Sequence, residues 1–267
     1  MLDTMKKAIP VPVRRAIGEM LDAVDRTAQM PAAMFHPWRR DTMERLSALH
    51  NRHKGERCFI IGNGPSLRHT DMSKLRGEYT LGMNRIYLMF PELGFQTTYY
   101  LSVNDLVIEQ CAAEIQTLKM PRFVSWRARR WLTPEPDLYF LWTTYTGPKF
   151  ATDLRGRLWE GATVTYTALQ TAYYLGFSEV ILIGVDHNFT TQGKPNTTVV
   201  SQGDDPNHFS PAYFGKGFRW QLPDLETSER AYRMAREAFE RDGRRVLDAT
   251  VGGKLTVFPK VDYETLF

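Results

Sequence analysis

The stretch CFIIGNGPSL, residues 58–67, predicts a buried strand that ends in a loop of small residues. The four apolar residues before Gly62 form the kind of short run that is typical of a strand covered on both faces. The residues that follow, Asn63 to Ser66, fit two interpretations. They suit a tight turn, and they equally suit a loop whose backbone approaches a phosphate or nucleotide closely.

Strand and helix patterns alternate on both sides of this stretch. Strands are expected at 57–62, 79–84, 97–104, 122–126, 138–144, 179–186 and 245–250, and helices at 14–29, 39–53, 105–118, 165–177 and 224–243. This alternation predicts an α/β fold with a Rossmann-like, mostly parallel sheet and helices on both faces. Residues 1–56 are expected to form an N-terminal helical extension, and residues 57–267 the Rossmann-like domain.

One long segment, 187–222, interrupts the alternation and is rich in Gly, Pro, Asn and Asp. A loop of this length inside a compact domain is usually functional or disordered. The sequence therefore predicts a lid-like loop over the same sheet.

The composition is that of a soluble globular protein, with 43% apolar and 24% charged residues among 267. The chain has two cysteines, and Cys58 lies in the apolar run, as expected of a buried thiol in a reducing cytoplasm. The first 20 residues contain no apolar stretch typical of a signal peptide or a spanning helix. The expected location is therefore cytoplasmic, with a peripheral contact at the inner membrane.

That membrane contact is expected because positive charge gathers near the N-terminus. Residues 1–57 hold 11 Lys or Arg against 7 Asp or Glu, whereas the remaining residues are neutral. A basic leader, here residues 1–40, suggests contact with acidic lipid headgroups or with a partner, and the alternative is a solvated helical arm. A homo-oligomer is a further possibility. The basic, aromatic stretch at 122–131 lacks a nucleic-acid-binding motif, so no nucleic-acid partner is expected.

Polar side chains stand where four of the expected strands end. Asn63, Asn84, Asn104 and Asp186 each follow an apolar strand. In a parallel sheet these ends share one rim, where ligands bind. Asn offers a donor and an acceptor without charge, which suits a nucleobase or ribose better than a metal ion. Each Asn can also serve as a cap or turn residue, and Asp186 fits capping and ligand binding equally well.

Four segments together resemble a known family: IIGNGPSL, GMNRIYL, YYLSVNDLVIEQ and TYTALQTAYYLGFSEVILIGVD. They are similar to the bacterial CMP-sialic-acid-dependent sialyltransferases that modify lipooligosaccharide, and to the broader MptE-like domains. Those domains include proteins of flagellin glycosylation and archaeal 6-hydroxymethylpterin diphosphokinases. The similarity covers roughly residues 57–250.

The resemblance implies roles for individual residues. Asn63, Asn84 and Asn104 match asparagines that hold the CMP part of the donor, and Thr163 and Asp186 match residues beside the nucleotide. His208 matches a histidine in the lid that acts as general base. The predicted nucleotide site is completed by Gly62, Gly64, Ser66 and Thr165.

The chain departs from the family pattern in two places. The family's hydroxyl-Ser-Gly run reads Thr163-Val164-Thr165, and no residue clearly matches the tyrosines that steady the leaving phosphate. Tyr213 is the candidate substitute, and Lys216 and Arg219 are candidate donors to the same phosphate.

His208 also fits a catalytic role on its own chemistry, because imidazole titrates near neutral pH and can take a proton from a hydroxyl. The alternative is a surface or structural histidine. His187, directly after Asp186, is the second candidate.

Three functions remain open. The first is an inverting glycosyltransferase that moves a nonulosonate-like acidic sugar from a CMP-activated donor to a cell-surface glycan or lipid-linked acceptor, with no obligatory cofactor. The second is a pterin pyrophosphokinase that uses ATP and Mg²⁺, which needs carboxylates at a strand end. The segment LSVNDLVIEQ has only one Asp there. The third is a non-catalytic MptE-like module of envelope glycan assembly.

Overall fold

The computed structural model describes residues 11–190 and 193–267, and its core is one eight-stranded sheet. The strand order is β10-β7-β1-β2-β3-β4-β5-β6, and every neighbouring pair is parallel. The strands are β1 (Arg57–Ile61), β2 (Thr80–Met83), β3 (Tyr99–Ser102), β4 (Arg122–Ser125), β5 (Leu138–Thr144), β6 (Arg157–Trp159), β7 (Glu179–Ile183) and β10 (Arg245–Asp248). The predicted Rossmann-like fold is confirmed.

The strand order reverses at β1. From β1 the chain moves outward through β2 to β6, and it then returns to place β7 on the other side of β1. Ile61 at the end of β1 therefore has Gly82 as its partner on one side and Ile183 on the other. In sheets of this kind the crevice at the carboxyl ends beside such a reversal is where ligands bind.

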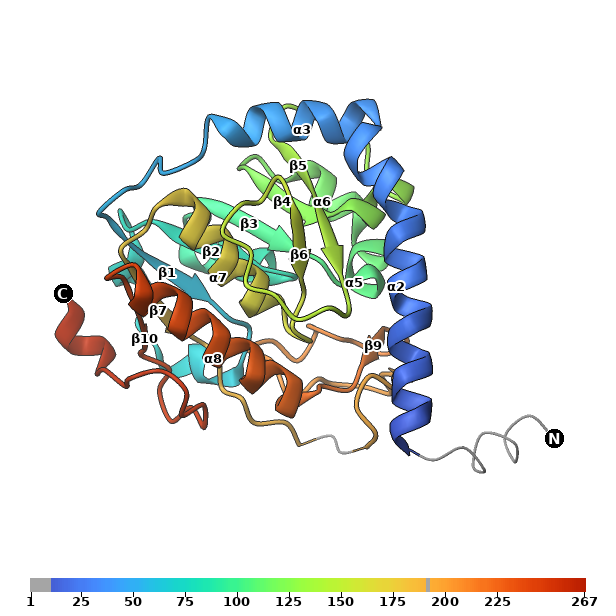
Figure 1. Ribbon diagram of the computed structural model, residues 1–267. Coiled ribbons are helices and arrows are strands. Elements are labelled where there is room, and N and C mark those ends of the chain that lie inside the picture. The colour runs from blue at the N-terminus through green and yellow to red at the C-terminus, as the bar shows by residue number, and fades with distance from the viewer. Residues whose placement is uncertain (1–10, 191–192) are drawn as a thin grey trace.

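Helices cover both faces of the sheet (Figure 1). The helices are α2 (Val11–Phe35), α3 (Pro37–Ser47), α4 (Phe90–Leu93), α5 (Asp105–Gln110), α6 (Ala112–Thr117), α7 (Val164–Leu175) and α8 (Leu225–Arg241). Cys58 and Ile60 pack with α7 and α8, whereas Phe59 and Ile61 pack with α5 and α6. This alternation along β1 explains why the strand is apolar throughout.

The N-terminal helices differ in length from those expected. The first extends through Phe35, and the second begins at Pro37 and ends at Ser47, short of residue 53. Pro37 suits the first helical position because it has no N–H to leave unpaired. The His36 side chain caps this helix by accepting a hydrogen bond from the Trp38 N–H at 3.2 Å. None of the described helices is long and apolar enough to cross a membrane.

The expected helix at 105–118 is divided at Cys111 into α5 and α6, because Cys111 leaves helical geometry with φ −121°. Cys58 and Cys111 are both buried and free, and burial raises the pKa of the Cys58 thiol. The sequence reading also missed β6 and the antiparallel hairpin β8 (Thr198–Val200) and β9 (Arg219–Gln221). Strands of three residues are too short to show a period of two.

The connections include short 3₁₀ helices: η1 (Pro65–His69), η2 (Met72–Leu75), η3 (Ile86–Met89), η4 (Trp126–Arg130) and η5 (Tyr263–Leu266).

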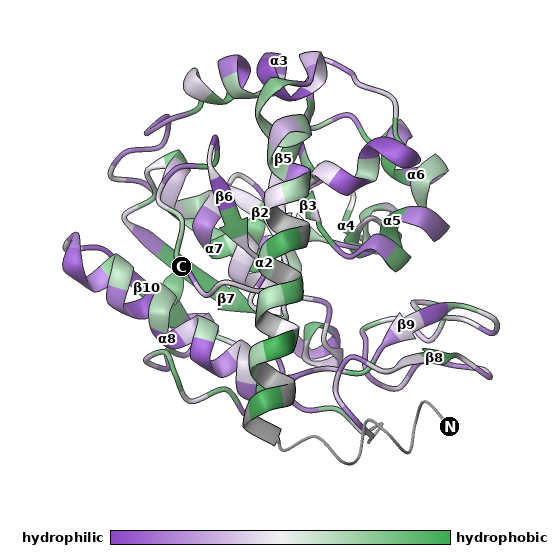
Figure 2. Ribbon diagram, turned by 45° about the vertical axis from the view of Figure 1, so that its right-hand side comes forward, coloured by the Kyte–Doolittle hydropathy of each residue, from purple (hydrophilic) through white to green (hydrophobic). Residues whose placement is uncertain are grey.

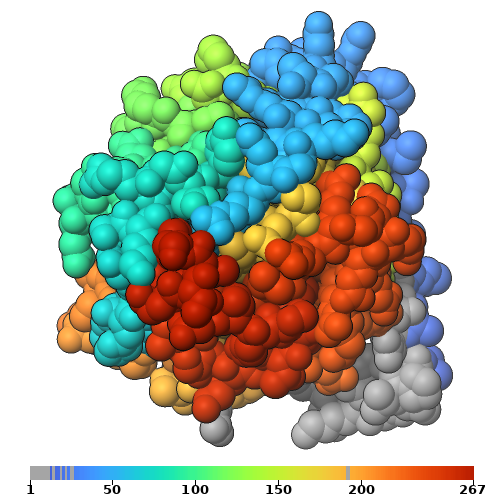
Figure 3. All heavy atoms as spheres, turned by 90° about the vertical axis from the view of Figure 1, so that its left-hand side faces the viewer, coloured from blue at the N-terminus to red at the C-terminus, as the bar shows by residue number. Residues whose placement is uncertain are grey.

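The C-terminus of the chain lies against the first strand, β1. Figure 3 shows the last residues, in dark red, lying against the segment that follows β1. Phe267 stacks on Phe59 with ring centres 5.8 Å apart. The last residue of the chain therefore packs against the face of β1 that Phe59 occupies.

Candidate functional site

A pocket of about 210 Å³ lies at the carboxyl ends of the strands, beside the reversal at β1. Its walls come from the loops after β1, β2, β3 and β7, from the start of α7 and from the lid, residues 187–222. Ten of the thirteen predicted site residues line it: Gly62, Asn63, Gly64, Asn84, Asn104, Thr163, Thr165, Asp186, His208 and Tyr213. Ser66, Lys216 and Arg219 are not part of the lining.

The glycines of the first loop allow β1 and β7 to come together at the pocket. A Cβ on Gly62 would lie 2.2 Å from the carbonyl oxygen of Gly184, and one on Gly64 would lie 1.8 Å from Oδ2 of Asp186. The Gly64 N–H donates to the Gly184 carbonyl at 2.9 Å. These glycines are therefore required by close approach, Gly62 to the backbone of Gly184 and Gly64 to the side chain of Asp186. The loop that they form lines the pocket.

Asp186 is bound to this loop. Its Oδ1 accepts from the Ser66 N–H at 3.1 Å and its Oδ2 from the Ser66 hydroxyl at 2.6 Å. Asp186 thus holds the start of η1 in place while it also borders the pocket. Ser66 reaches the site only through this carboxylate, because its own side chain lies outside the lining.

Asn63 presents an unpaired acceptor. Its side chain is 9% exposed, and its Nδ2 donates to the Met83 carbonyl at 3.1 Å. That bond sets the orientation of the amide, because only the nitrogen can donate. Its Oδ1 is buried and has no hydrogen-bond partner among the described residues. A buried acceptor without a partner is costly, which points to a ligand donor in this place.

Asn84 and Asn104 present the opposite group. The Asn84 Oδ1 accepts from the Ser102 hydroxyl at 3.0 Å, and its backbone is left-handed with φ 51°, a conformation that Asn tolerates. The Asn104 Oδ1 caps α5 by accepting from the N–H groups of Leu106 and Val107 at 3.0 and 3.3 Å. Neither Nδ2 has a partner among the described residues. The two asparagines use their oxygens within the fold, and both line the pocket.

The N-terminus of α7 also lines the pocket. Thr163 caps this helix, and its hydroxyl accepts from the Thr165 N–H at 3.3 Å and lies 3.3 Å from the Tyr232 hydroxyl. Gly161 and Ala162 before it have φ of 60° and 58°. A left-handed alanine is strained. After this left-handed turn, Ala162 to Thr165 all line the pocket.

Several hydrogen bonds dock the lid onto the domain. Its Phe209 N–H donates to the Asn63 carbonyl at 2.9 Å, and Arg68 donates to the Phe209 carbonyl at 2.7 Å. Arg85 donates to the carbonyl of Tyr213. Near β9, the Arg219 N–H and carbonyl pair with the Gln110 side chain on α5, both at 2.8 Å. These contacts fasten the described part of the lid, residues 187–190 and 193–222, to the domain.

The lid carries a histidine paired with a carboxylate. His208 Nδ1 lies 2.7 Å from Oδ2 of Asp205, and Asp205 is 6% exposed. The Asn207 N–H donates to the other carboxylate oxygen at 2.8 Å. The imidazole is stacked flat on Tyr213, with ring centres 3.9 Å apart. Asp205 was not predicted from the sequence, although its position three residues before His208 in the same loop is a signal that could have identified it.

A sequence model of the family described as "6-hydroxymethylpterin diphosphokinase MptE-like" matches residues 39–192, more than half of the chain. The protein belongs to the MptE-like family. The similarity was expected over roughly residues 57–250, whereas the match begins at residue 39 and ends at residue 192, before most of the lid. It therefore includes the loops of Asn63, Asn84 and Asn104 but not His208. No curated protein sequence matches the chain significantly.

The solved structures that resemble this MptE-like protein include two transferases. The first is the MAf glycosyltransferase from Magnetospirillum magneticum AMB-1, with TM-score 0.50 and 16% identity, covering 92% of this chain. The chain spans 42% of that protein. A mammalian sialyltransferase in complex with Gal-beta-1-3GalNAc-ortho-nitrophenol has TM-score 0.32 and 11% identity, covering 82% of this chain and 80% of its own. At 16% identity, the likeness to the MAf glycosyltransferase shows a shared fold alone.

The remaining candidates have other partners. His187 lines the pocket, but its Nε2 lies 3.1 Å from Glu229 on α8. The Tyr213 hydroxyl accepts from the Arg85 N–H at 3.3 Å, and burial raises the pKa of Tyr213. Arg219 forms an ion pair with Glu109 at 2.9 Å, and Lys216 is exposed. His187 and His208 therefore both line the pocket with one ring nitrogen on a carboxylate, and they differ in that partner, because the Asp205 side chain is buried and that of Glu229 is 39% exposed.

Proposed function

We propose that this MptE-like protein is an inverting glycosyltransferase that uses a CMP-activated, nonulosonate-like sugar. The observation that carries the proposal is the Asp205–His208 pair at a pocket whose other walls offer uncharged amide groups. A cytosine ring and a ribose both need a mixture of donors and acceptors. The Asn63 Oδ1 and the amino groups of Asn84 and Asn104 provide such a mixture without a charge.

The start of α7 is suited to the phosphate of CMP. The described residues that line the pocket include no Lys or Arg. An anion there would rely on the free N–H groups and positive dipole end of this helix. The Thr163 hydroxyl stands at the same point as a further polar contact. This arrangement requires no metal ion to hold the phosphate.

His208 is suited to act as the general base. An ionised carboxylate only accepts, so the Asp205 contact places the ring proton on Nδ1 and leaves Nε2 as an acceptor. Nε2 would take the proton of the acceptor hydroxyl while that oxygen attacks the anomeric carbon. The bond from that carbon to the CMP oxygen breaks, and its electron pair leaves with CMP. Attack opposite the leaving group inverts the configuration.

The contacts of the acidic residues favour this proposal over ATP- and Mg²⁺-dependent pyrophosphate transfer. Such chemistry needs carboxylates free to hold the metal. The Asp105 carboxylate accepts from Arg127 at 2.8 and 3.0 Å, and that of Asp186 accepts from Ser66. Asp224, also in the lining, caps α8 through Thr227 at 2.9 and 3.0 Å. Each carboxylate already stabilises the protein itself.

A lipid-linked or cell-surface acceptor would place the enzyme at a membrane, and α2 is suited to that contact. Met20, Leu21 and Val24 are 60%, 61% and 62% exposed on this helix. Figure 2 shows that α2 lies on the outside of the molecule and carries several green, hydrophobic bands along its length. Residues 1–10, with Lys6 and Lys7, lie outside the described residues. We propose that this apolar surface of α2, together with the basic leader, contacts anionic lipid.

A nucleotide screen tests the function directly. CMP, CDP, UDP, GDP and ATP are each titrated calorimetrically, with and without Mg²⁺. We expect CMP to bind without Mg²⁺ and more tightly than the others. Binding of ATP with Mg²⁺ and not of CMP would overturn the transferase proposal in favour of a pyrophosphokinase. A non-catalytic module would bind CMP and show no turnover with any CMP-sugar.

A further inference from the structure

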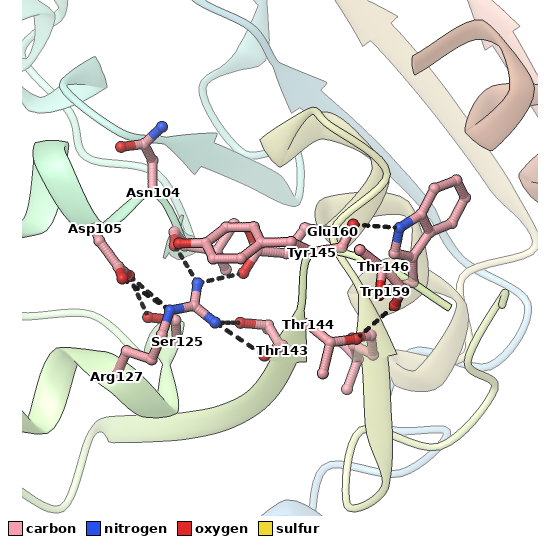
Figure 4. A network of polar contacts seen from close by, with 12 residues as sticks. Asn104, Asp105, Ser125, Arg127, Thr143, Thr144, Tyr145, Thr146, Trp159 and Glu160 are labelled. Atoms are coloured by element: carbon pink, nitrogen blue, oxygen red, sulfur yellow. Dashed lines mark hydrogen bonds and ion pairs between the residues drawn. The ribbon is translucent and has the colours of Figure 1, made fainter. Parts of the chain in front are cut away.

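Arg127 forms a buried polar network beside the pocket (Figure 4). It lies in η4, just past the end of β4, and is 7% exposed. Its Nε donates to both carboxylate oxygens of Asp105 at 2.8 and 3.0 Å. Its Nη2 donates to Glu160 at 2.6 Å, and its Nη1 to the Thr143 carbonyl at 2.9 Å. One guanidinium therefore joins the ends of three neighbouring strands and the segment after β6.

The two carboxylates lie close in sequence to two different parts of the pocket lining, Asn104 and Thr163. Asp105 follows Asn104 and is the first residue of α5. Glu160 follows β6, and its carbonyl accepts from the Thr163 N–H at 3.2 Å. Only Gly161 and Ala162 stand between Glu160 and Thr163, and both have left-handed backbones. Strained backbone of this kind persists only where the surrounding contacts hold it.

The network needs an arginine. A cation at this depth is stable only when it is paired, and the planar guanidinium can donate to Asp105, Glu160 and a carbonyl in separate directions at once. Burial opposes the charged form, but the Glu160 and Asp105 carboxylates outweigh it and raise the pKa of Arg127. A lysine would supply the charge from a single point and could not hold both carboxylates in these places.

We propose that Arg127 is a positioning residue that sets the distance between the Asn104 wall and the Thr163 wall of the pocket. Through Asp105 it holds the start of α5, where the Asn104 amino group is presented. Through Glu160 it holds the strained turn that presents the N-terminus of α7. The part of this inference that concerns the ligand rests on the proposed nucleotide site, whereas the coupling of the two walls does not.

Hydrogen exchange measured by mass spectrometry tests the coupling without a ligand. In Arg127→Met we expect faster exchange in both segments, 104–110 and 160–168, which are far apart in the sequence. Asp105→Asn should affect mainly the first segment, and Glu160→Gln mainly the second. These milder variants keep the test valid should Arg127→Met fail to fold. Faster exchange confined to 125–131, or spread over the whole sheet, would overturn the inference.

Arg122 provides a matched control at the other end of the same strand. It is 2% exposed, donates to Glu135 at 2.5 Å and to the Ile115 and Gln116 carbonyls, and does not line the pocket. Arg122→Met also removes a buried cation. We expect it to lower the melting temperature without faster exchange in both pocket segments and without a change in ligand affinity.

The affinities for cytidine and for CMP then distinguish the contributions of the two walls to binding. Asp105→Asn should weaken cytidine and CMP by the same factor, about tenfold, because it releases the Asn104 wall. Glu160→Gln should weaken CMP about tenfold and leave cytidine nearly unchanged, because it releases the phosphate-facing wall. If both variants lost the same affinity for cytidine as for CMP, the two walls would not bind different parts of the ligand, and this inference would be contradicted. Failure of the wild type to bind CMP would instead refute the nucleotide site, and the exchange experiment would still decide the coupling.

Discussion

His208 and Asp205 form a hydrogen-bonded pair in the lid, with Nδ1 and Oδ2 2.7 Å apart. Stacking on Tyr213 fixes the plane of the ring as well. A general base needs this double restraint, because its free nitrogen must meet one particular hydroxyl proton.

The first prediction separates this pair from binding. His208→Ala should lower turnover at least about a hundredfold and leave CMP affinity nearly intact, because a positioned base contributes about 10²–10⁴-fold. Asp205→Asn should lower turnover by a similar factor, because the amide favours the wrong tautomer. The exposed neighbour Asp204 gives the control, and Asp204→Asn should keep wild-type turnover. Full activity in His208→Ala would shift the role of base to His187.

The second prediction concerns the amides. Asn63→Ala, Asn84→Ala and Asn104→Ala should each weaken CMP by about 1–3 kcal/mol, the cost of leaving a desolvated polar group without its partner. Asn63→Asp should be worse than Asn63→Ala, because it replaces the amino group that bonds to the Met83 carbonyl with an acceptor. Calorimetry measures these affinities, and circular dichroism confirms that the variants are folded. Unchanged CMP affinity in all three alanine variants would place the nucleotide elsewhere.

The third prediction tests the close approach at the strand reversal. Gly62→Ala places a Cβ against the backbone of Gly184, which cannot move aside as a side chain would, so we expect a loss of at least about 2 kcal/mol of stability. Gly156→Ala is the control, because its Cβ would have an ordinary contact at 3.6 Å. Urea unfolding measures both, and equal stability of the two variants would contradict the role assigned to Gly62.

The fourth prediction concerns acid stability. A hydrogen bond from Arg122, followed by one from Gln116, lowers the pKa of Glu135. Because the folded pKa lies below the unfolded one, the pair stabilises the protein at neutral pH, and this contribution is lost as the pH falls through the folded pKa. Glu135→Gln should therefore cost about 1 kcal/mol at pH 7, a small amount because the carboxylate is 36% exposed.

Melting curves between pH 7 and pH 3 measure this effect. The melting temperatures of the wild type and of Glu135→Gln should converge on acidification. Glu240→Gln, which disrupts an exposed i,i+4 pair with Arg236, provides the control and should change stability very little. A constant difference between Glu135→Gln and the wild type across this range would exclude the ionised pair as the cause.

The fifth prediction concerns the membrane. Liposomes with anionic headgroups should carry the full chain in a flotation gradient, and a triple serine substitution at Met20, Leu21 and Val24 should reduce its recovery several-fold. Each basic residue near such a surface contributes about 1 kcal/mol, so added salt should weaken the remaining binding. Val251→Ser, at an apolar side chain that is 45% exposed elsewhere, is the control. Equal recovery of the triple variant and the wild type would reject the contact.

Much of the fold follows from local patterns in the sequence. The long apolar strands and periodic helices were predicted near their true places, because burial on one or both faces leaves a direct mark on the order of residues. The rim of asparagines followed as well, since parallel strands bring their carboxyl ends to one edge. The short strands β6, β8 and β9 left no such mark, and neither did the break at Cys111.

What only the tertiary structure decided is how each polar group is used. By sequence, Asn104 fits a cap or a ligand group, and in the fold its oxygen caps α5 while its nitrogen has no hydrogen-bond partner among the described residues. By sequence, Asp186 fits capping and ligand binding equally well, and Asp105 is the single carboxylate that follows its strand. In the fold, Ser66 and Arg127 donate to these two carboxylates from positions 120 and 22 residues away. A hydrogen bond depends on distances that the folded chain sets between remote segments. The sequence alone therefore determined which strand ends meet at the pocket, while the packing of those ends determined which donors and acceptors remain for a ligand.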